Sequence, residues 1–191
     1  MPWRYLPLLA LGFSLLGAAR AEPVGYRLDP THTSVTWEVL HFGTSTLRGR
    51  FASLGGDVEI DRAARRGRVA VEIDVRTLQT GVPVFDARLR ERDLFATADH
   101  PAAWFVAERL EFDAAGHLQT VTGELTLKGR SIGLTLRAVR FGCYTNPLWR
   151  KEVCGGDFEG RLRRSDAGMD VALPFVADEV VLRVQAEGVR Q

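Results

Sequence analysis

The chain has 191 residues, of which 46% are hydrophobic and 26% are charged, and its formal net charge is +1 at pH 7. This length suits one domain with a substantial core. The near-neutral charge, with no block of like charge, excludes a basic nucleic-acid-binding face, so we expect no nucleic-acid partner. Only Lys128 and Lys151 are lysines among 25 basic residues, which indicates a preference for arginine rather than a phosphate-reading function.

Residues 1–21 have the features of a secretory signal peptide. A positive charge near the start precedes an apolar run over residues 6–19, and the motif Ala19-Arg20-Ala21 has small residues at both critical positions of a cleavage site. The run is short for a bilayer span, although an uncleaved N-terminal anchor is the alternative. We therefore expect a periplasmic protein whose mature chain, residues 22–191, has lost two arginines and has a formal charge of −1.

The mature chain alternates between apolar and polar residues in short runs, which predicts antiparallel β-strands. The first run, residues 33–42, has one apolar row that ends in a histidine: Val35, Trp37, Val39 and His41. Further runs cover residues 45–51, 57–60, 68–75, 102–112, 118–127, 132–141, 158–164 and 179–188. The clearest row is that of the run 68–75, namely Val69, Val71, Ile73 and Val75.

The period changes over residues 83–98, where Phe85, Leu89 and Arg92 lie at helical spacing. We expect one or two short helices here, ending before Pro101. Eight or nine antiparallel strands with one helical insert fit either a sandwich or a closed barrel. Periodicity alone therefore predicts an all-β fold and does not choose between the two.

Cys143 and Cys154 are the only cysteines. In an exported protein such a pair most simply forms a disulfide, which would close a short loop and contribute about 3 kcal/mol to stability. A redox-active dithiol or half of a metal site is the alternative, but the chain has no Cys-x-x-Cys and no histidine beside the pair. We expect a structural disulfide and no metal.

A series of motifs, spread in order over nearly the whole mature chain, resembles the YceI family. The motifs are Tyr26-Arg27-Leu28-Asp29, His32-Thr33-Ser34-Val35, Trp37-Glu38-Val39-Leu40-His41, Gly49-Arg50-Phe51, Asp86, Leu89, Pro101, Phe105, residues 121–129, Arg164-Ser165-Asp166 and Asp178-Glu179-Val180. That family is described as periplasmic, lipocalin-like proteins that bind polyisoprenoids.

The resemblance implies an all-β fold, an antiparallel eight-stranded lipocalin-like barrel with a short helical insert near one mouth. It implies a binding protein rather than an enzyme, with no cofactor and with a non-covalent isoprenoid lipid or quinone as its ligand. The helical insert, residues 83–98, is then the expected gate. Transient contact with a membrane follows from such a ligand, and the resemblance leaves room for a homodimer.

The chain differs from the family pattern in the helical insert. Where the family usually has Arg-Asp-x-His-Leu, this chain has Phe85-Asp86-Ala87-Arg88-Leu89, and a later Asp-Phe-Gly is Asp166-Ala167-Gly168. Any contact that the family's arginine and histidine make with a ligand head group is therefore altered here. Arg88, Arg90 and Arg92 form either a solvated face or a site for an anionic head group.

In a barrel the apolar rows would face the lumen and hold an isoprenoid tail. The residues expected to bind it are Val35, Trp37, Val39, His41, Phe51, Val71, Ile73, Phe85, Leu89 and Phe105. His41 either bonds a head-group oxygen near the mouth or is a core histidine satisfied by a neighbouring strand's carbonyl or by water. On the opposite face, Leu40 and Phe42 are expected to lie under the helical insert.

Two other classes of protein are weighed against a carrier. Ser165-Asp166 with a distant histidine suggests a hydrolase, but the chain has no Gly-x-Ser-x-Gly motif. The four histidines are too scattered for a metal motif. The other alternative is a filled barrel that serves as a scaffold or as a stress-related interaction protein, without a ligand.

Overall fold

The computed structural model describes residues 22–191, so the expected signal peptide lies outside the described residues and stays a prediction. The strands are β1 (Val24–Leu28), β2 (Ser34–His41), β3 (Ser45–Phe51), β4 (Leu54–Asp61), β5 (Arg66–Asp74), β6 (Ala102–Phe112), β7 (Leu118–Leu127), β8 (Arg130–Thr145), β9 (Glu152–Arg163) and β10 (Val176–Arg190). The helices are η1 (Val75–Thr77), α1 (Pro83–Leu89) and η2 (Arg164–Ala167). Within residues 22–191, no helix has the length and apolar character that crossing a bilayer requires.

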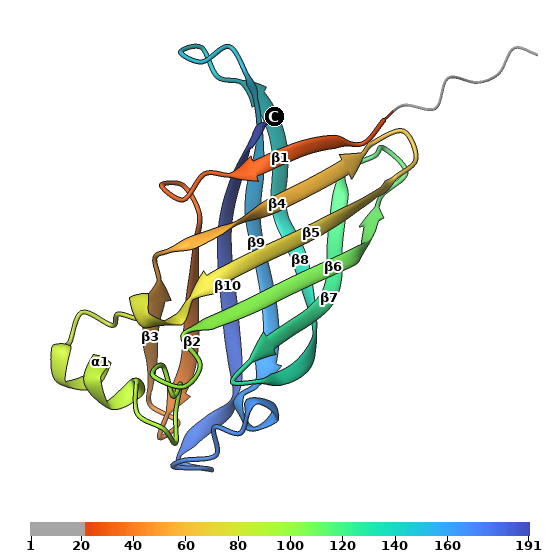
Figure 1. The fold of residues 1–191 in the computed structure, drawn as a ribbon. Helices are drawn as coiled ribbons and strands as arrows, with labels where there is room; N and C mark the ends of the chain where they lie inside the picture. Colours follow the sequence, from red (N-terminus) through yellow and green to blue (C-terminus); the bar gives the residue numbers. More distant parts are fainter. Residues whose placement is uncertain (1–21) are drawn as a thin grey trace, which may run out of the picture.

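The strands form one antiparallel sheet that closes on itself (Figure 1). β1 and β2 lie end to end along β10, which pairs with β2 up to Gln185 and with β1 from Gly188 onward. β3 and β4 continue each other in the same way, because β3 pairs with β2 and β4 pairs with β1. The ring therefore has eight strand positions, and the expected eight-stranded antiparallel barrel is confirmed.

Alternation along each strand places one row of side chains in the barrel interior. In β6, for example, Ala103, Phe105 and Ala107 are buried while Trp104 and Val106 are exposed. The buried rows of most strands form one hydrophobic cluster inside the ring. β8 and β9 extend beyond this ring as a hairpin, at the opposite end of the molecule from α1 (Figure 1).

The helical insert is shorter than expected and lies near one end of the barrel, outside β2 and β3 (Figure 1). Pro83 starts the helix, as its fixed φ and missing N–H favour. After Leu89 the chain continues in turns up to residue 99. Asp86 holds the segment before the helix, because its Oδ1 accepts hydrogen bonds from the backbone N–H and the hydroxyl of Thr80, both at 2.6 Å.

The expected disulfide is confirmed: Cys143 and Cys154 are paired across β8 and β9 and are bonded through their sulfurs. The double substitution Cys143→Ser/Cys154→Ser is expected to lower the free energy of unfolding by about 3 kcal/mol, because the unfolded chain gains the entropy of an open loop. Urea denaturation measures the change. The oxidised protein treated with a thiol reductant should show the same loss, and the double variant should not respond to the reductant. A loss below about 0.5 kcal/mol would contradict the stabilising role assigned to this bond.

Candidate ligand-binding cavity

A cavity of about 390 Å³ lies inside the barrel. This volume is in the range of small-molecule binding sites. Nearly all of the side chains that line it are aliphatic or aromatic. All ten residues that the sequence nominated contribute to the lining: Val35, Trp37, Val39, His41, Phe51, Val71, Ile73, Phe85, Leu89 and Phe105. The structure thus brings the whole predicted set together around one space.

The sequence interpretation missed much of the lining that follows α1. These residues come from the turns after α1, from β7 to β10 and from the loop before β10: Leu94, Phe95, Val121, Leu125, Leu134, Leu136, Phe141, Phe158, Leu162, Met169, Val176, Val180, Leu182 and Val184. The alternation of apolar and polar residues along β7 to β10 could have identified most of them. Phe95 follows a helix and gave no such signal.

An aromatic cluster forms the wall of the cavity nearest α1. The ring of Phe95 lies 5.5 Å from that of Phe51, edge to face, and 6.3 Å from that of Trp37. Trp37 packs over Gly49 of the neighbouring strand, where a Cβ atom would lie only 2.1 Å from the indole. Glycine at this position therefore makes room for Trp37, whose buried indole N–H has no hydrogen-bond partner among residues 22–191.

We place the mouth of the cavity at the α1 end, because lining residues there, among them Leu47, Phe85 and Arg88, are partly exposed. His41 is half-buried at this rim, beside Val176 of β10, and its imidazole makes no hydrogen bond within the described chain. No strand carbonyl of the described residues accepts from it, so the interpretation of a core histidine is left with water as the partner. The ring leaves a donor and an acceptor free next to the apolar lumen.

The expectation that Leu40 and Phe42 lie under the helical insert is wrong. Leu40 is 46% exposed and Phe42 is 59% exposed. Phe42 has a φ of +48°, and its N–H donates to the carbonyl of Phe175 at 2.7 Å. This geometry turns the Phe42 ring outward, where it stacks on Phe175 with 5.3 Å between ring centroids. α1 ends too early to cover either residue.

The arginines of the insert are held by groups of the protein itself. Arg88 lines the cavity but donates to Glu91 at 2.8 Å and to both carboxylate oxygens of Asp93 at 2.7 Å. Arg88 accordingly holds the pKa of Asp93 below its usual value. Arg92 pairs with Asp99 at 3.2 Å. The internal partners of Arg88 and Arg92 make both weaker candidates for an anionic head group.

A buried arginine fixes the loop that forms the other side of the mouth. Arg164 is 6% exposed, and its guanidinium donates to the backbone carbonyls of Met169, Val176 and Ala177. Two of these acceptors belong to residues that line the cavity, Met169 and Val176. The loop before β10 is thereby held in shape by one side chain.

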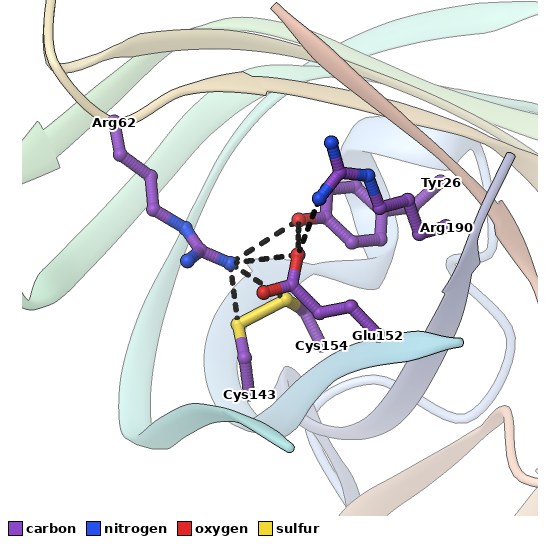
Figure 2. The surroundings of a disulfide bond; sticks show 6 residues. All are labelled: Tyr26, Arg62, Cys143, Glu152, Cys154 and Arg190. Carbon is purple, nitrogen blue, oxygen red and sulfur yellow. Dashed lines mark hydrogen bonds and ion pairs between the residues drawn. A yellow bond between two sulfur atoms is a disulfide. The ribbon is translucent and has the colours of Figure 1, made fainter. Parts of the chain in front are cut away.

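A polar cluster surrounds the disulfide (Figure 2) and adjoins the cavity, whose lining includes Tyr26 and Cys154. Tyr26 is 2% exposed and lines the lumen, and its hydroxyl donates to Glu152 at 2.5 Å. Arg62 donates to the Tyr26 oxygen at 3.1 Å, lies 3.4 Å from Glu152 and contacts both disulfide sulfurs. Burial and the bond to Glu152 raise the pKa of Tyr26, so the phenol stays neutral and keeps donating.

This cluster is not a metal site in the oxidised protein. Cys143, Glu152 and Cys154 place ligand-type atoms within 4.8 Å of one another. Both sulfurs are in the disulfide, however, and metals bind the thiolate form of cysteine. Sequence reasoning did not anticipate the cluster, because Tyr26 and Glu152 are 126 positions apart.

The closed ring and its apolar lumen define the class of this protein as a lipocalin-like β-barrel. Comparison with known proteins then gives the family: the chain belongs to the YceI-like domain family, whose profile matches residues 26–188. This confirms the family prediction.

Curated relatives match along almost the entire chain. A UPF0312 protein of Pseudomonas aeruginosa is 31% identical over 189 residues, and one of Azotobacter vinelandii is 29% identical over 189 residues. Each match covers 97% of both chains.

Solved structures share the fold at lower identity. BcnA of Burkholderia cenocepacia superposes with a TM-score of 0.66 at 21% identity and covers 84% of this chain and 98% of its own. A polyisoprenoid-binding domain from Saccharophagus degradans, implicated in plant cell wall breakdown, gives 0.60 at 17% identity, with 87% and 98% covered.

Proposed function

We propose that this protein is a periplasmic carrier or sequestering protein for an isoprenoid-tailed lipid of the quinone or polyprenyl type. The observation that carries the proposal is the apolar cavity of about 390 Å³ inside the barrel. Membership of the YceI-like family and the fold shared with a polyisoprenoid-binding domain support the choice of an isoprenoid ligand. The export pattern of residues 1–21 supports the periplasmic location.

The cavity supplies a physical reason for binding without covalent chemistry. Moving about 300 Å² of isoprenoid surface out of water gains about 7 kcal/mol before the costs of association. The lumen presents few polar groups to such a tail, and those it has lie toward its ends, with His41 at the mouth and Tyr26 at the far end. This distribution favours an orientation in which the tail of the lipid lies in the lumen and its polar head group lies at the mouth.

Equilibrium binding to the delipidated protein tests the proposal. Ubiquinone and a polyprenol of matched tail length should bind with dissociation constants in the micromolar range or below, and a saturated straight-chain alcohol should bind more weakly. A filled barrel that serves as a scaffold would bind none of the three. Turnover of any of these compounds would favour the enzyme alternative.

His41→Phe is expected to weaken binding of a quinone about two- to tenfold, because a bound head-group oxygen would lose one hydrogen bond. Binding of squalene, which has an isoprenoid skeleton and no head group, should stay unchanged. Fluorescence titration with both ligands makes the comparison. Equal affinities of the variant and the parent protein for the quinone would remove the head-group role of His41.

Residues 83–98 are the proposed gate, since Phe85 and Leu89 reach the cavity from this segment. Asp86→Ala removes both hydrogen bonds from Thr80 and is expected to speed ligand release several-fold. Stopped-flow transfer of a fluorescent polyprenol to acceptor vesicles measures the rate. The control is Asp99→Ala, which removes an exposed carboxylate immediately after this segment and should leave the rate unchanged.

The hydrogen bonds between Thr80 and Asp86 also make ligand release depend on pH. Hydrogen bonds from Thr80 lower the pKa of Asp86 below its usual value. A carboxyl with a lowered pKa stabilises the fold above about pH 4, and this contribution disappears as the pH falls through the lower folded-state pKa. Release should therefore accelerate on acidification below about pH 4 in the parent protein, and less so in Asp86→Ala. An identical pH profile for both would contradict the anchoring role.

A further inference from the structure

The hairpin tip, residues 144–151, comprises the end of β8 and the turn into β9, and it carries the most exposed large apolar side chain of the described chain. Leu148 is 84% exposed, and beside it Trp149 is 54% and Tyr144 is 50% exposed. The hairpin projects beyond the barrel at the end opposite α1 (Figure 1). Isolated exposed apolar residues are ordinary, but a leucine, a tryptophan and a tyrosine gathered at one protruding tip call for a partner.

The tip has a defined backbone conformation. The Asn146 side-chain oxygen accepts hydrogen bonds from the backbone N–H groups of Leu148 and Trp149, at 2.9 and 3.2 Å. The Asn146 backbone also bonds Arg150 and Lys151, both at 2.8 Å. The disulfide joins the two strands immediately below the tip. The apolar side chains are therefore presented by an ordered turn on a stapled hairpin.

The residues of the tip carry only positive charges, and the one carboxylate that bonds them from outside is Glu187, which accepts from the Tyr144 hydroxyl at 3.3 Å. Arg150 and Lys151 are exposed, and residues 142–151 contain no aspartate or glutamate. Within residues 22–191 neither cation forms an ion pair. The nearest carboxylate in sequence, Glu152, is already engaged by Tyr26 and Arg62 (Figure 2). The two cations are thus left available for an external anion.

We propose that the hairpin tip docks on an anionic lipid bilayer. Tryptophan favours the membrane–water interface, and leucine favours the adjoining acyl region. Each cation near an anionic surface adds about a fivefold gain in binding. Leu148 and Trp149 would enter the interface while Arg150 and Lys151 meet lipid phosphates. An acidic protein surface would pair with Arg150 and Lys151, but it would offer no apolar environment to Leu148. A bilayer offers both, so it fits the tip better.

Docking by the tip has a consequence for cargo exchange. β8 has 16 residues, which at about 3.3 Å per residue gives a strand of about 50 Å. The tip lies at the opposite end of the barrel from α1 (Figure 1), and the mouth is placed at the α1 end. A protein held by its tip would therefore keep its mouth away from that bilayer, and would load or release lipid toward the aqueous side. This inference goes beyond the proposed function and does not require it.

Vesicle co-sedimentation of the purified protein tests the docking. The parent protein should bind vesicles of phosphatidylcholine with 30 mol% phosphatidylglycerol more strongly than pure phosphatidylcholine vesicles, and added salt should weaken binding. Leu148→Ser/Trp149→Ser should lower partitioning at least tenfold. Its matched control, Phe42→Ser/Phe175→Ser, removes two exposed apolar side chains at the mouth and should leave partitioning unchanged.

A second pair of variants keeps the test independent of the apolar substitutions. Arg150→Gln/Lys151→Gln should lower partitioning about 25-fold, from about fivefold for each cation, whereas Arg137→Gln on the barrel wall should have little effect. Circular dichroism confirms that each variant is folded.

Binding that is absent, that survives both tip variants, or that is lost in the mouth variant instead would overturn the proposal. Lipid loading, measured by mass spectrometry on the two tip variants, is expected to be unaffected, so failure of docking and failure of the carrier function are distinguishable.

Discussion

Ala103→Trp is expected to reduce the lipid bound per protein at least tenfold while leaving the barrel folded. Ala103 is 2% exposed, lines the cavity from β6 and pairs with Ile73 of β5. Its small side chain leaves lumen free, and an indole added here would occupy space that an isoprenoid tail needs. Because the new ring enters a cavity of about 390 Å³ rather than a packed core, the cost in stability should stay within about 1–3 kcal/mol.

The control for this variant is Val106→Trp on the outer face of the same strand. Val106 is 43% exposed, so the substitution adds tryptophan to β6 without touching the lumen. Extraction of both purified variants followed by mass spectrometry gives the lipid content. The control should load like the parent protein. Full loading of Ala103→Trp would show that lipid binds somewhere other than the cavity.

Arg164→Met is expected to lower the free energy of unfolding by about 3 kcal/mol, since it leaves the backbone carbonyls of Met169, Val176 and Ala177 without their donor. It should also speed ligand release, because these bonds hold the loop before β10 to the start of that strand, at one side of the mouth. Urea denaturation and vesicle transfer measure the two effects.

The neighbouring arginine provides a sharp comparison. Arg163 is exposed and pairs with Asp178 at 2.8 Å, so Arg163→Met should cost no more than about 1 kcal/mol. Equal losses for the two variants would contradict the structural role assigned to Arg164.

Much of this fold is readable from the sequence because alternation is a local property. The runs 45–51, 102–112 and 118–127 coincide with β3, β6 and β7. The same alternation placed Val71, Ile73 and Phe105 on the lumen side, where the structure has them. The choice of a barrel over a sandwich came from the family resemblance, since alternation is common to both.

The features that the sequence did not predict depend on contacts between segments that are far apart along the chain. β1 is five residues long and was not predicted, although with β4 it completes the ring. The Tyr26–Glu152 bond joins residues that are 126 positions apart. Phe42 was misplaced because its backbone turns at a positive φ toward Phe175, which no periodic pattern signals. The signal peptide and a homodimer stay predictions.

Native mass spectrometry of the protein, gently extracted and never exposed to detergent or organic solvent, tests the central claim most directly. A lumen that holds an isoprenoid lipid predicts one adduct per polypeptide, with a mass that changes in steps of one isoprene unit between species. A spectrum that contains only the bare polypeptide, from a preparation whose cavity also fails to take up added polyprenol, would contradict it.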